Sequence, residues 1–235
     1  ARADRAGDGF TLTGAKEHVY FASAADRLLV LARTGDGDAG VDPFLVDPNA
    51  DGVTLTQKMS ISSDTQYHLD LDGAAAELVG SVGTGWSTWE SVLTDGIILA
   101  AAQAIGGADY ALEITVQYAK DREQFDKPLG AFQALSHDMA DAVTTVDGGK
   151  ILVYEAAWAH SVGQSVARLA PMAKLFATKT YRDVTAMAQQ IFGGVGFTLE
   201  YDIQLYFRRA KQLQLSWWDS RALEERVAAA VLDAA

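Results

Sequence analysis

The spacing of apolar residues changes near residues 83–85, and this change constrains the fold more than any other feature of the sequence. Before it, short apolar runs alternate with turn-forming Gly, Asp, Asn and Pro, as in GFTLTGAK, DRLLVLARTG and YHLDLDG. Residues 68–72 alternate between polar and apolar side chains, which is the period of a strand with one buried face. We therefore expect residues 1–82 to form a small β domain, either a barrel or a sandwich.

Beyond this point apolar residues recur at helical spacing. Ile98, Ile105 and Leu112 fall on one stripe, and Pro171 suits the first turn of a later helix because its missing N–H needs no partner there. Breaks at residues 126–130, 163–171 and 193–196 divide this part into four long helices. The pattern predicts an antiparallel four-helix bundle over residues 83–235 and an α+β fold for the chain.

Composition excludes several classes of protein. The chain has no cysteine, which rules out disulfides, thiolate metal sites and cysteine nucleophiles and favours a cytoplasmic location. Its net charge of −12 argues against a nucleic-acid partner. No uninterrupted apolar run reaches about 18 residues, so no membrane span is expected. The polar start without Met indicates the interior of a longer protein.

The segment REQFDKPLG, residues 122–130, leads from a helix end into a Pro-Gly break. The Arg122 guanidinium is a fork of donors suited to a phosphate or carboxylate, and Phe125 is an apolar side chain beside it. A plain helix C-terminus gives the same pattern, because a cation there interacts favourably with the helix dipole. From this segment alone, the plain C-terminus is the stronger interpretation.

A second segment, QIFGGVGFTLEY at residues 190–201, has three glycines in four positions. Glycine lets the backbone approach a ligand closely, and exposed amides ahead of a helix can cradle a phosphate. The glycines follow a helix rather than a strand, so this is not a Rossmann fingerprint. A simple connection between two helices remains the alternative.

Together, in this order and spacing, the two segments resemble the acyl-CoA dehydrogenase family. YAKDREQFDKPLGAFQA at residues 118–134 is similar to the end of the first helix of that family's C-terminal domain. QIFGGVGFTLEY, followed by YFRRAK at residues 206–211, is similar to its later glycine segment, and the β half is similar to its middle domain. The resemblance implies α,β-dehydrogenation of an acyl-CoA thioester, with a hydride passing to FAD.

The resemblance also implies site residues and partners. FAD in the family lies between subunits. The contacts implied near the adenine and pyrophosphate are Arg122, Gln124, Phe125 and Gln133. Those implied at the adenosine diphosphate part are Gln190, Gly193 and Gly194. The implied partners are an acyl-CoA substrate, further subunits of a homo- or hetero-tetramer, and an electron-transfer flavoprotein.

Several positions depart from the family pattern. The family's N-terminal helical domain and its following strand motif are absent from this sequence. His18-Val19-Tyr20 stand where members often have Trp-Ile-Thr facing the flavin; Tyr20 is a candidate flavin contact, and ordinary strand residues are the alternative. Asp126 stands where the family usually has Gly, and its carboxylate would repel a nearby diphosphate.

The most serious departure concerns the catalytic base. Trp217 occupies the position of the family's usual Glu, and Gly96 lies at the alternative position on the first long helix. Trp cannot abstract a proton, which leaves Asp219 as a weak candidate base, although Asp219 also suits the N-cap of the last helix. Two hypotheses follow.

The first is an active dehydrogenase. The second is a base-lacking subunit that completes the FAD site of a heteromeric enzyme, similar to the actinobacterial heterotetramers that act on sterol side chains. A third possibility, a bundle without enzymatic role, is disfavoured because Arg122, Gln124, Gln190 and the glycine triplet are retained.

Overall fold

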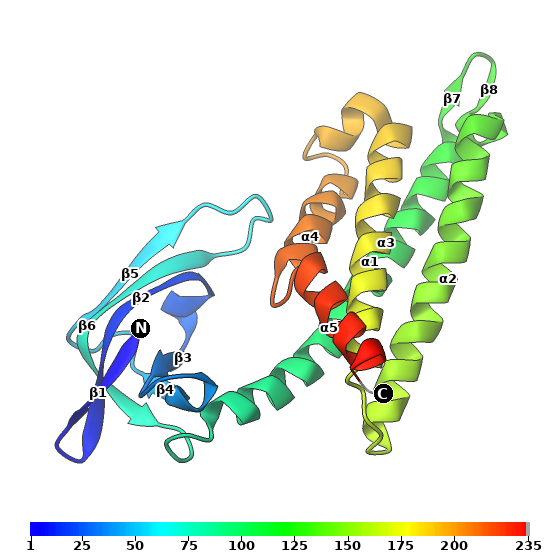
Figure 1. Cartoon of the computed structure of the whole chain (residues 1–235). Coiled ribbons are helices and arrows are strands. Elements are labelled where there is room, and N and C mark those ends of the chain that lie inside the picture. The colour runs from blue at the N-terminus through cyan, green and yellow to red at the C-terminus, as the bar shows by residue number, and fades with distance from the viewer. Residues whose placement is uncertain (234–235) are drawn as a thin grey trace. The chain divides into compact units, whose positions relative to one another are not determined.

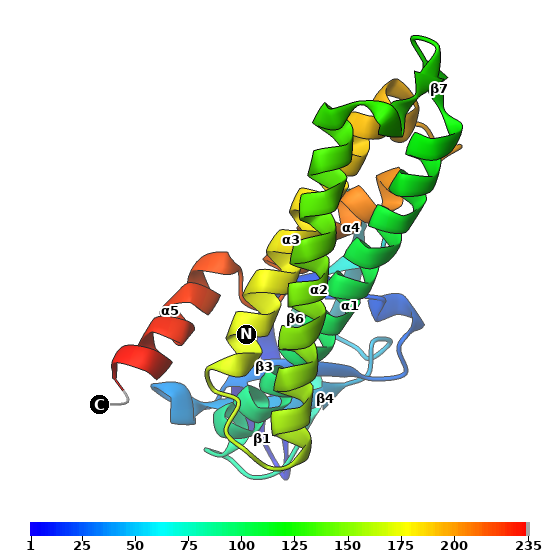
Figure 2. The same cartoon turned by 90° about the vertical axis from the view of Figure 1, so that its right-hand side faces the viewer.

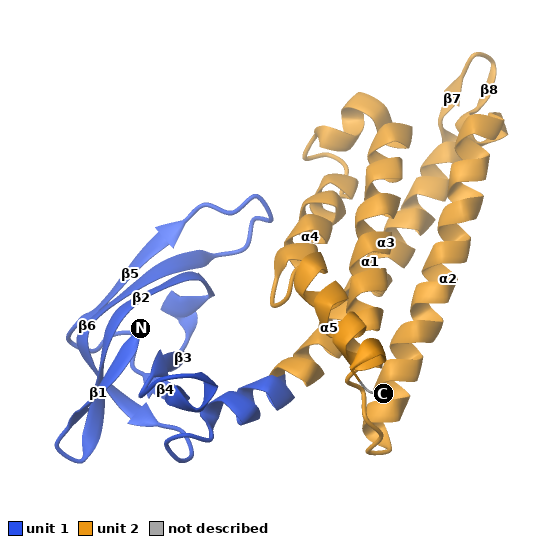
Figure 3. Cartoon of the chain, viewed as in Figure 1, with its two compact units in different colours: residues 1–92 blue, residues 93–235 orange. Residues whose placement is uncertain are grey.

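The computed structural model describes residues 1–233, which pack as two units (Figure 3). The first unit spans Ala1–Val92 and the second begins at Leu93, so the division falls inside helix α1 (Gly85–Asp121). The boundary predicted from the sequence lies earlier, just before that helix begins. Each unit has its own interior and is described separately.

Six strands form the first unit as a closed barrel, one of the two arrangements expected from the sequence (Figure 1). They are, in chain order, β1 (Arg2–Ala6), β2 (Gly9–Tyr20), β3 (Leu28–Arg33), β4 (Val41–Val46), β5 (Val53–Lys58) and β6 (Gln66–Leu78). The strands pair in the order β2-β1-β3-β4-β6, and β6 returns to β2, which closes the ring, while β5 extends the sheet beyond β6. All pairs are antiparallel except β1 with β3.

Alternation along the strands fills the barrel with apolar side chains. Leu12, Phe44 and Leu69 are fully buried, and Phe10 packs edge-on against Phe44 with 5.2 Å between ring centroids. The expected strand at residues 68–72 lies within β6, where Leu69 and Leu71 point inward. The hydrophobic effect of this interior explains why the short runs separated by turns fold into a closed sheet.

A buried carboxylate anchors the start of α1 within the first unit. Asp42 on β4 accepts hydrogen bonds from the Thr34 hydroxyl (2.6 Å) and from the backbone N–H groups of Gly83 and Gly85 (3.0 Å each). Burial alone would raise the pKa of Asp42, but these hydrogen bonds outweigh it and hold the pKa below its ordinary value. The first N–H groups of a helix lack intrahelical partners, so Asp42 satisfies donors that would otherwise be unpaired.

The second unit is helical (Figures 1 and 2). Its elements are α1, α2 (Gln133–Ser161), α3 (Leu169–Phe192), α4 (Ile203–Leu215) and α5 (Ser220–Leu232). Helix α3 is the centre, since it packs against α2, α4 and α5 and buries residues along most of its length. Figure 2 shows α1, α2 and α3 running alongside one another.

The prediction of an α+β fold with a helical bundle is confirmed, and the last of the four predicted helical segments is divided in two. The described residues contain five α-helices rather than four, because residues 216–219 interrupt the last helical stretch between α4 and α5. Pro171 lies in the first turn of α3, as expected.

Helix α1 bears on the expectation about membrane spans. By length and composition it could cross a membrane, and 39% of its most apolar window is buried in the structure. The search for uninterrupted apolar runs missed it, because a few polar residues divide an otherwise apolar stretch. One such helix is weak evidence for a span, since the core helix of a bundle has the same composition.

Candidate functional site

A short hairpin connects α1 to α2 and carries the first candidate segment. Strand β7 (Glu123–Gln124) pairs with β8 (Lys127–Pro128), and the N–H of Leu129 donates to the carbonyl oxygen of Arg122 (2.9 Å). Phe125 and Asp126 form the tip with left-handed φ angles of 53° and 62°. In Figure 1 the hairpin projects beyond the ends of α1 and α2. The sequence suggested a plain helix end, whereas the structure shows a built turn that presents an 86% exposed Phe125.

The second candidate segment forms a tight turn at the end of α3. Residues Gly193–Phe197 make a 3-10 turn. At its start, the N–H of Gly193 donates to the carbonyl oxygen of Gln189. A β-carbon added at Gly194 would meet no heavy atom within 4 Å, whereas one at Gly196 would lie 2.6 Å from Oε1 of Gln189. The turn therefore has an open side at Gly194 and a closely packed side at Gly196.

The hairpin and the turn meet at one cavity of about 450 Å³ in the second unit. Its lining residues come from the end of α1, the hairpin, the end of α3 and the turn: Tyr118, Arg122, Gln124, Leu129, Ile191, Phe192, Gly194, Val195 and Thr198. Two segments separated by about seventy residues of sequence thus line one cavity.

Stacked aromatic rings form one wall of the cavity. The rings of Tyr118 and Phe192 lie nearly parallel, 13° apart in plane and 4.1 Å between centroids, and Tyr201 packs edge-on against both. Such pairs hold each other in fixed orientations. The wall is therefore flat, apolar and preorganised.

The donors at the cavity suit an anionic ligand. Arg122 is exposed, and no ion pair involves it among residues 1–233. A guanidinium can grip a diphosphate through two parallel hydrogen bonds, and Gly194 allows close approach of backbone amides. The flat apolar wall, the unpaired guanidinium and the open glycine turn fit a nucleotide that carries a diphosphate.

The remaining predicted cofactor residues lie outside the cavity lining. Phe125 is at the hairpin tip, Gln133 is the exposed first residue of α2, and Gln190 and Gly193 are exposed at the end of α3. Their exposure leaves them free to contact a ligand or another subunit, and their cofactor roles stay predictions.

Tyr20 belongs to the first unit, at the end of β2, where it is 36% exposed. Its neighbour His18 has a left-handed φ of 57° at an irregularity in the pairing of β2 with β6, and its Nδ1 lies 2.8 Å from Oε1 of Gln66. Left-handed backbone at a non-glycine residue is sterically unfavourable. The flavin role suggested for this strand end stays a prediction.

Trp217 and Gly96, the two positions at which the resemblance implies a catalytic base, lie side by side in the second unit. A β-carbon added at Gly96 would come within 2.6 Å of Cζ3 of Trp217, so the indole ring lies directly on the α-carbon of Gly96. The neighbouring Asp95 forms an ion-pair contact with His160, 3.1 Å from its Nε2. Asp219 caps α5, since its Oδ1 accepts from the N–H of Ala222 (3.0 Å). A base at Asp219 therefore stays a prediction, while its capping bond is observed.

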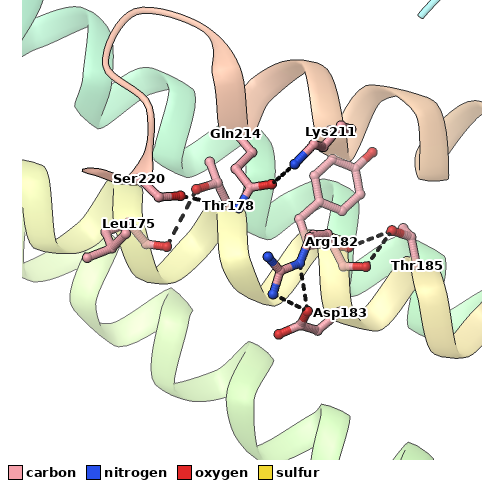
Figure 4. A network of polar contacts seen from close by, with 9 residues as sticks. Leu175, Thr178, Arg182, Asp183, Thr185, Lys211, Gln214 and Ser220 are labelled. Atoms are coloured by element: carbon pink, nitrogen blue, oxygen red, sulfur yellow. Dashed lines mark hydrogen bonds and ion pairs between the residues drawn. The ribbon is translucent and has the colours of Figure 1, made fainter. Parts of the chain in front are cut away.

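Several contacts hold the turn that carries Trp217. The Lys174 side chain on α3 is fully buried, and its Nζ donates to the carbonyl oxygen of Trp218 (2.7 Å). Burial lowers the pKa of Lys174 to about 8, while Asp219 acts in the opposite direction. Gln214 on α4 donates to the hydroxyl of Ser220 on α5 (3.2 Å), as Figure 4 shows. Trp217 itself has a left-handed φ of 58°.

Sequence reasoning missed two kinds of residue at this site. The stacked pair Tyr118 and Phe192 lies inside the candidate segments but looked like ordinary helix residues. Lys174 is a single cation in the apolar run PMAKLFA, and this was a visible signal of a buried, functional or structural amine.

Comparison with known proteins gives consistent results. The family model described as "Acyl-CoA dehydrogenase, C-terminal domain" matches residues 83–217. An acyl-CoA dehydrogenase of Bacillus subtilis is 35% identical over 214 residues, which cover 88% of this chain and 56% of that protein. The chain thus spans little more than half the length of the curated relatives it matches.

Solved structures share the fold over nearly the whole chain. The butyryl-CoA dehydrogenase of Megasphaera elsdenii superposes with a TM-score of 0.92 at 30% identity, covering 98% of this chain and 62% of that one. A structure described as a steroid ACAD variant superposes with a TM-score of 0.86 at 31% identity, covering 99% and 62%.

Proposed function

The chain belongs to the acyl-CoA dehydrogenase family, and from this membership we propose that it is part of a flavin-dependent enzyme that dehydrogenates an acyl-CoA thioester between its α and β carbons. The observation that carries the proposal is the cavity that Arg122 and Gly194 share with the stacked rings of Tyr118 and Phe192. FAD, when bound, supplies the hydride acceptor.

The residues of the second unit fit the nucleotide half of FAD. We assign Arg122 to the diphosphate, Gln124 to a polar group beside it, and the Gly193–Phe197 turn to the adenosine diphosphate part. Phe125, Gln133 and Gln190 are exposed outside the cavity lining, and we assign them to the FAD shared with a neighbouring subunit. Residues 83–235 would then serve both cofactor binding and assembly into a homo- or hetero-tetramer.

The proposed partners follow from the same reaction. The substrate is an acyl-CoA, whose α-proton and β-hydride leave together. The reduced flavin must return its electrons to a carrier, and an electron-transfer flavoprotein is the proposed acceptor.

A second candidate function is supported by the contact between Trp217 and Gly96. An indole ring occupies the place where the resemblance implies a base. The carboxylates that are neighbours in sequence are engaged, Asp95 with His160 and Asp219 with the start of α5. In this version the chain is a base-lacking subunit that completes the FAD site of a catalytic partner. The fold likeness to the steroid ACAD structure is consistent with either version.

One spectroscopic experiment distinguishes the active dehydrogenase from the base-lacking subunit. The full chain is purified alone, loaded with FAD and mixed anaerobically with short-chain, long-chain and steroid acyl-CoA thioesters, while the flavin absorbance is followed. Bleaching by any of them supports the active dehydrogenase. Retained flavin without bleaching, and bleaching only after co-expression with a second acyl-CoA dehydrogenase subunit, supports the base-lacking subunit. A chain that holds no flavin in either setting contradicts both.

A Trp217→Glu variant sharpens the distinction. If only the base is missing, the new carboxylate should accelerate bleaching by about 100-fold or more, the range that a positioned general base contributes. A Trp217→Gln variant is the matched control, because it removes the ring without supplying a base. Equal rates for the Glu and Gln variants would show that the missing base is not what limits this chain.

A further inference from the structure

The buried amide of Gln189 is the feature that the proposed function leaves unexplained. Gln189 lies in the last turn of α3, only 6% exposed, and neither Nε2 nor Oε1 has a hydrogen-bond partner among residues 1–233. The other buried glutamine side chains of the helical unit differ. Gln204 accepts from Arg208, and Gln214 accepts from Lys211 and donates to Ser220.

The unpaired amide is aimed at the glycine turn. A β-carbon at Gly196 would lie 2.6 Å from Oε1 of Gln189 and 2.9 Å from Cβ of Phe192, so the carboxamide is pressed against the α-carbon of Gly196. Gly194, two residues earlier in the same turn, is open and lines the cavity. The turn therefore touches the buried amide at Gly196 and lines the cavity at Gly194.

An unpaired buried amide is costly, because the group loses its hydrogen bonds to water and gains none in return. Packing does not require an amide here, since a methionine of similar volume would fill the same space. A polar group that is unpaired in one conformation is explained if it finds a partner in another. The groups within its reach that can change conformation are the N–H and C=O groups of the Gly193–Phe197 turn.

We propose that Gln189 is a positioning residue for nucleotide binding. When the adenosine diphosphate part of FAD enters the cavity, the amides of the Gly193–Phe197 turn reorient toward the anion, and the Gln189 carboxamide hydrogen-bonds the backbone groups that this movement turns inward. This inference rests on the proposed function. It adds that the turn is held by Gln189 in the nucleotide-bound form and not in the free form.

The test compares Gln189→Met with Gln214→Met in the full chain. Gln214 is an equally buried glutamine, 6% exposed, whose amide is already paired, so its replacement should lower the melting temperature of the ligand-free chain. Gln189→Met should instead raise that temperature by roughly 2–4 °C, because it removes an unpaired group. The same variant should weaken binding of ADP and of FAD, measured by calorimetry, by about tenfold, the loss of one or two hydrogen bonds.

A structural role alone would not produce this opposite response of stability and affinity. Backbone hydrogen exchange at residues 193–197 provides a second readout, since ADP should protect these amides in the unaltered chain and protect them less in Gln189→Met. If Gln189→Met weakens binding of both ADP and FAD, the effect lies at the adenosine diphosphate part that the two ligands share. Weaker binding of FAD alone would place the effect elsewhere and contradict the proposal.

The outcomes separate the two proposals. If the unaltered chain binds neither FAD nor ADP, the proposed function fails and this inference fails with it. If the chain binds both and Gln189→Met binds them equally well, only this inference is overturned. A lower melting temperature for ligand-free Gln189→Met would also overturn it, because the amide would then already be satisfied.

Discussion

The indole ring of Trp217 lies on the α-carbon of Gly96, so that a single added methyl at Gly96 would come 2.6 Å from the ring. The size of each side chain accounts for the size of the other. A side chain larger than hydrogen at position 96 would expel the ring, and the ring fills the space over this part of α1. The pair leaves no carboxylate at either position where the resemblance implies a base for proton abstraction.

Gly96→Ala tests this contact. Because Trp217 is 53% exposed, its ring can swing away, and we expect a moderate loss of about 1 kcal/mol in the free energy of unfolding. In Trp217→Ala the same Gly96→Ala substitution should stabilise the helix instead, since Ala favours helix over Gly by about 1 kcal/mol. Urea unfolding of both single variants and the double variant measures the coupling, and additive effects would show that the two residues do not interact.

The hairpin tip offers a second test. Asp126 has a left-handed φ of 62°, a conformation that glycine adopts without steric cost. Asp126→Gly should raise the free energy of unfolding by about 0.5 kcal/mol, a modest gain because Asp tolerates this region better than most residues. It also removes a negative charge near the proposed diphosphate site, so FAD should bind more tightly at low salt. Asp126→Asn, which removes only the charge, separates the two effects: a gain in affinity seen with Gly but not with Asn would exclude electrostatic repulsion as its cause.

Buried Lys174 should make stability depend on alkaline pH. Burial lowers its pKa to about 8 in the folded chain, below the ordinary value near 10.4 that applies when unfolded. Between these values the unfolded chain binds more protons, so stability should rise with pH from about 8 to about 10, by up to roughly 3 kcal/mol. Above this window the trend should reverse, because burial raises the pKa of Tyr181 and the unfolded tyrosine ionises first.

Lys174→Met provides the check. Denaturant unfolding at intervals from pH 7.5 to 10 should show the rise in the unaltered chain and no rise in the variant. The loss of the bond to Trp218 affects the variant equally at every pH, so it shifts the curve without changing its slope. A similar rise in both proteins would assign the effect to other groups.

Asp42 should produce a dependence of the same sign at acid pH, with stability rising as the pH rises. Its folded pKa lies below the ordinary value of about 3.9, so its contribution is present above that value and is lost as the pH falls through the folded pKa. Asp42→Asn should cost about 2 kcal/mol at pH 7, because charge-assisted bonds to Thr34, Gly83 and Gly85 are weakened. Thermal unfolding from pH 7 to pH 2.5 should show the difference shrinking with acid; a constant difference would mean that the charge of Asp42 contributes nothing.

The sequence predicted those parts of the molecule that follow from local periodicity and from recognisable segments. Alternation in β6 and the stripes along α1 and α3 were sufficient to predict a small β domain, barrel or sandwich, and a helical bundle. The family likeness implied cofactor roles for Arg122 and Gly194, although neither segment indicated a ligand by itself. In the structure both residues line one cavity.

What the sequence did not predict depends on contacts between residues far apart in the chain. The break at residues 216–219 has no proline or glycine, and it exists because Lys174 and the cap at Asp219 stabilise a turn there. The stacking of Tyr118 on Phe192 likewise appears only once α1 and α3 are placed together. Periodicity carries no information about such pairs.

The FAD content of Arg122→Ala tests the central claim most directly. The full chain, Arg122→Ala and Arg221→Ala are expressed alone and with a second acyl-CoA dehydrogenase subunit, and bound FAD per chain is measured from flavin absorbance. Arg221 is the matched control, an exposed arginine on α5 that pairs with Glu225. We expect FAD in the unaltered chain and in Arg221→Ala, and a loss of about tenfold or more in affinity in Arg122→Ala, the effect of one charge-assisted contact. Equal FAD content in all three would contradict the assignment of this cavity to the cofactor.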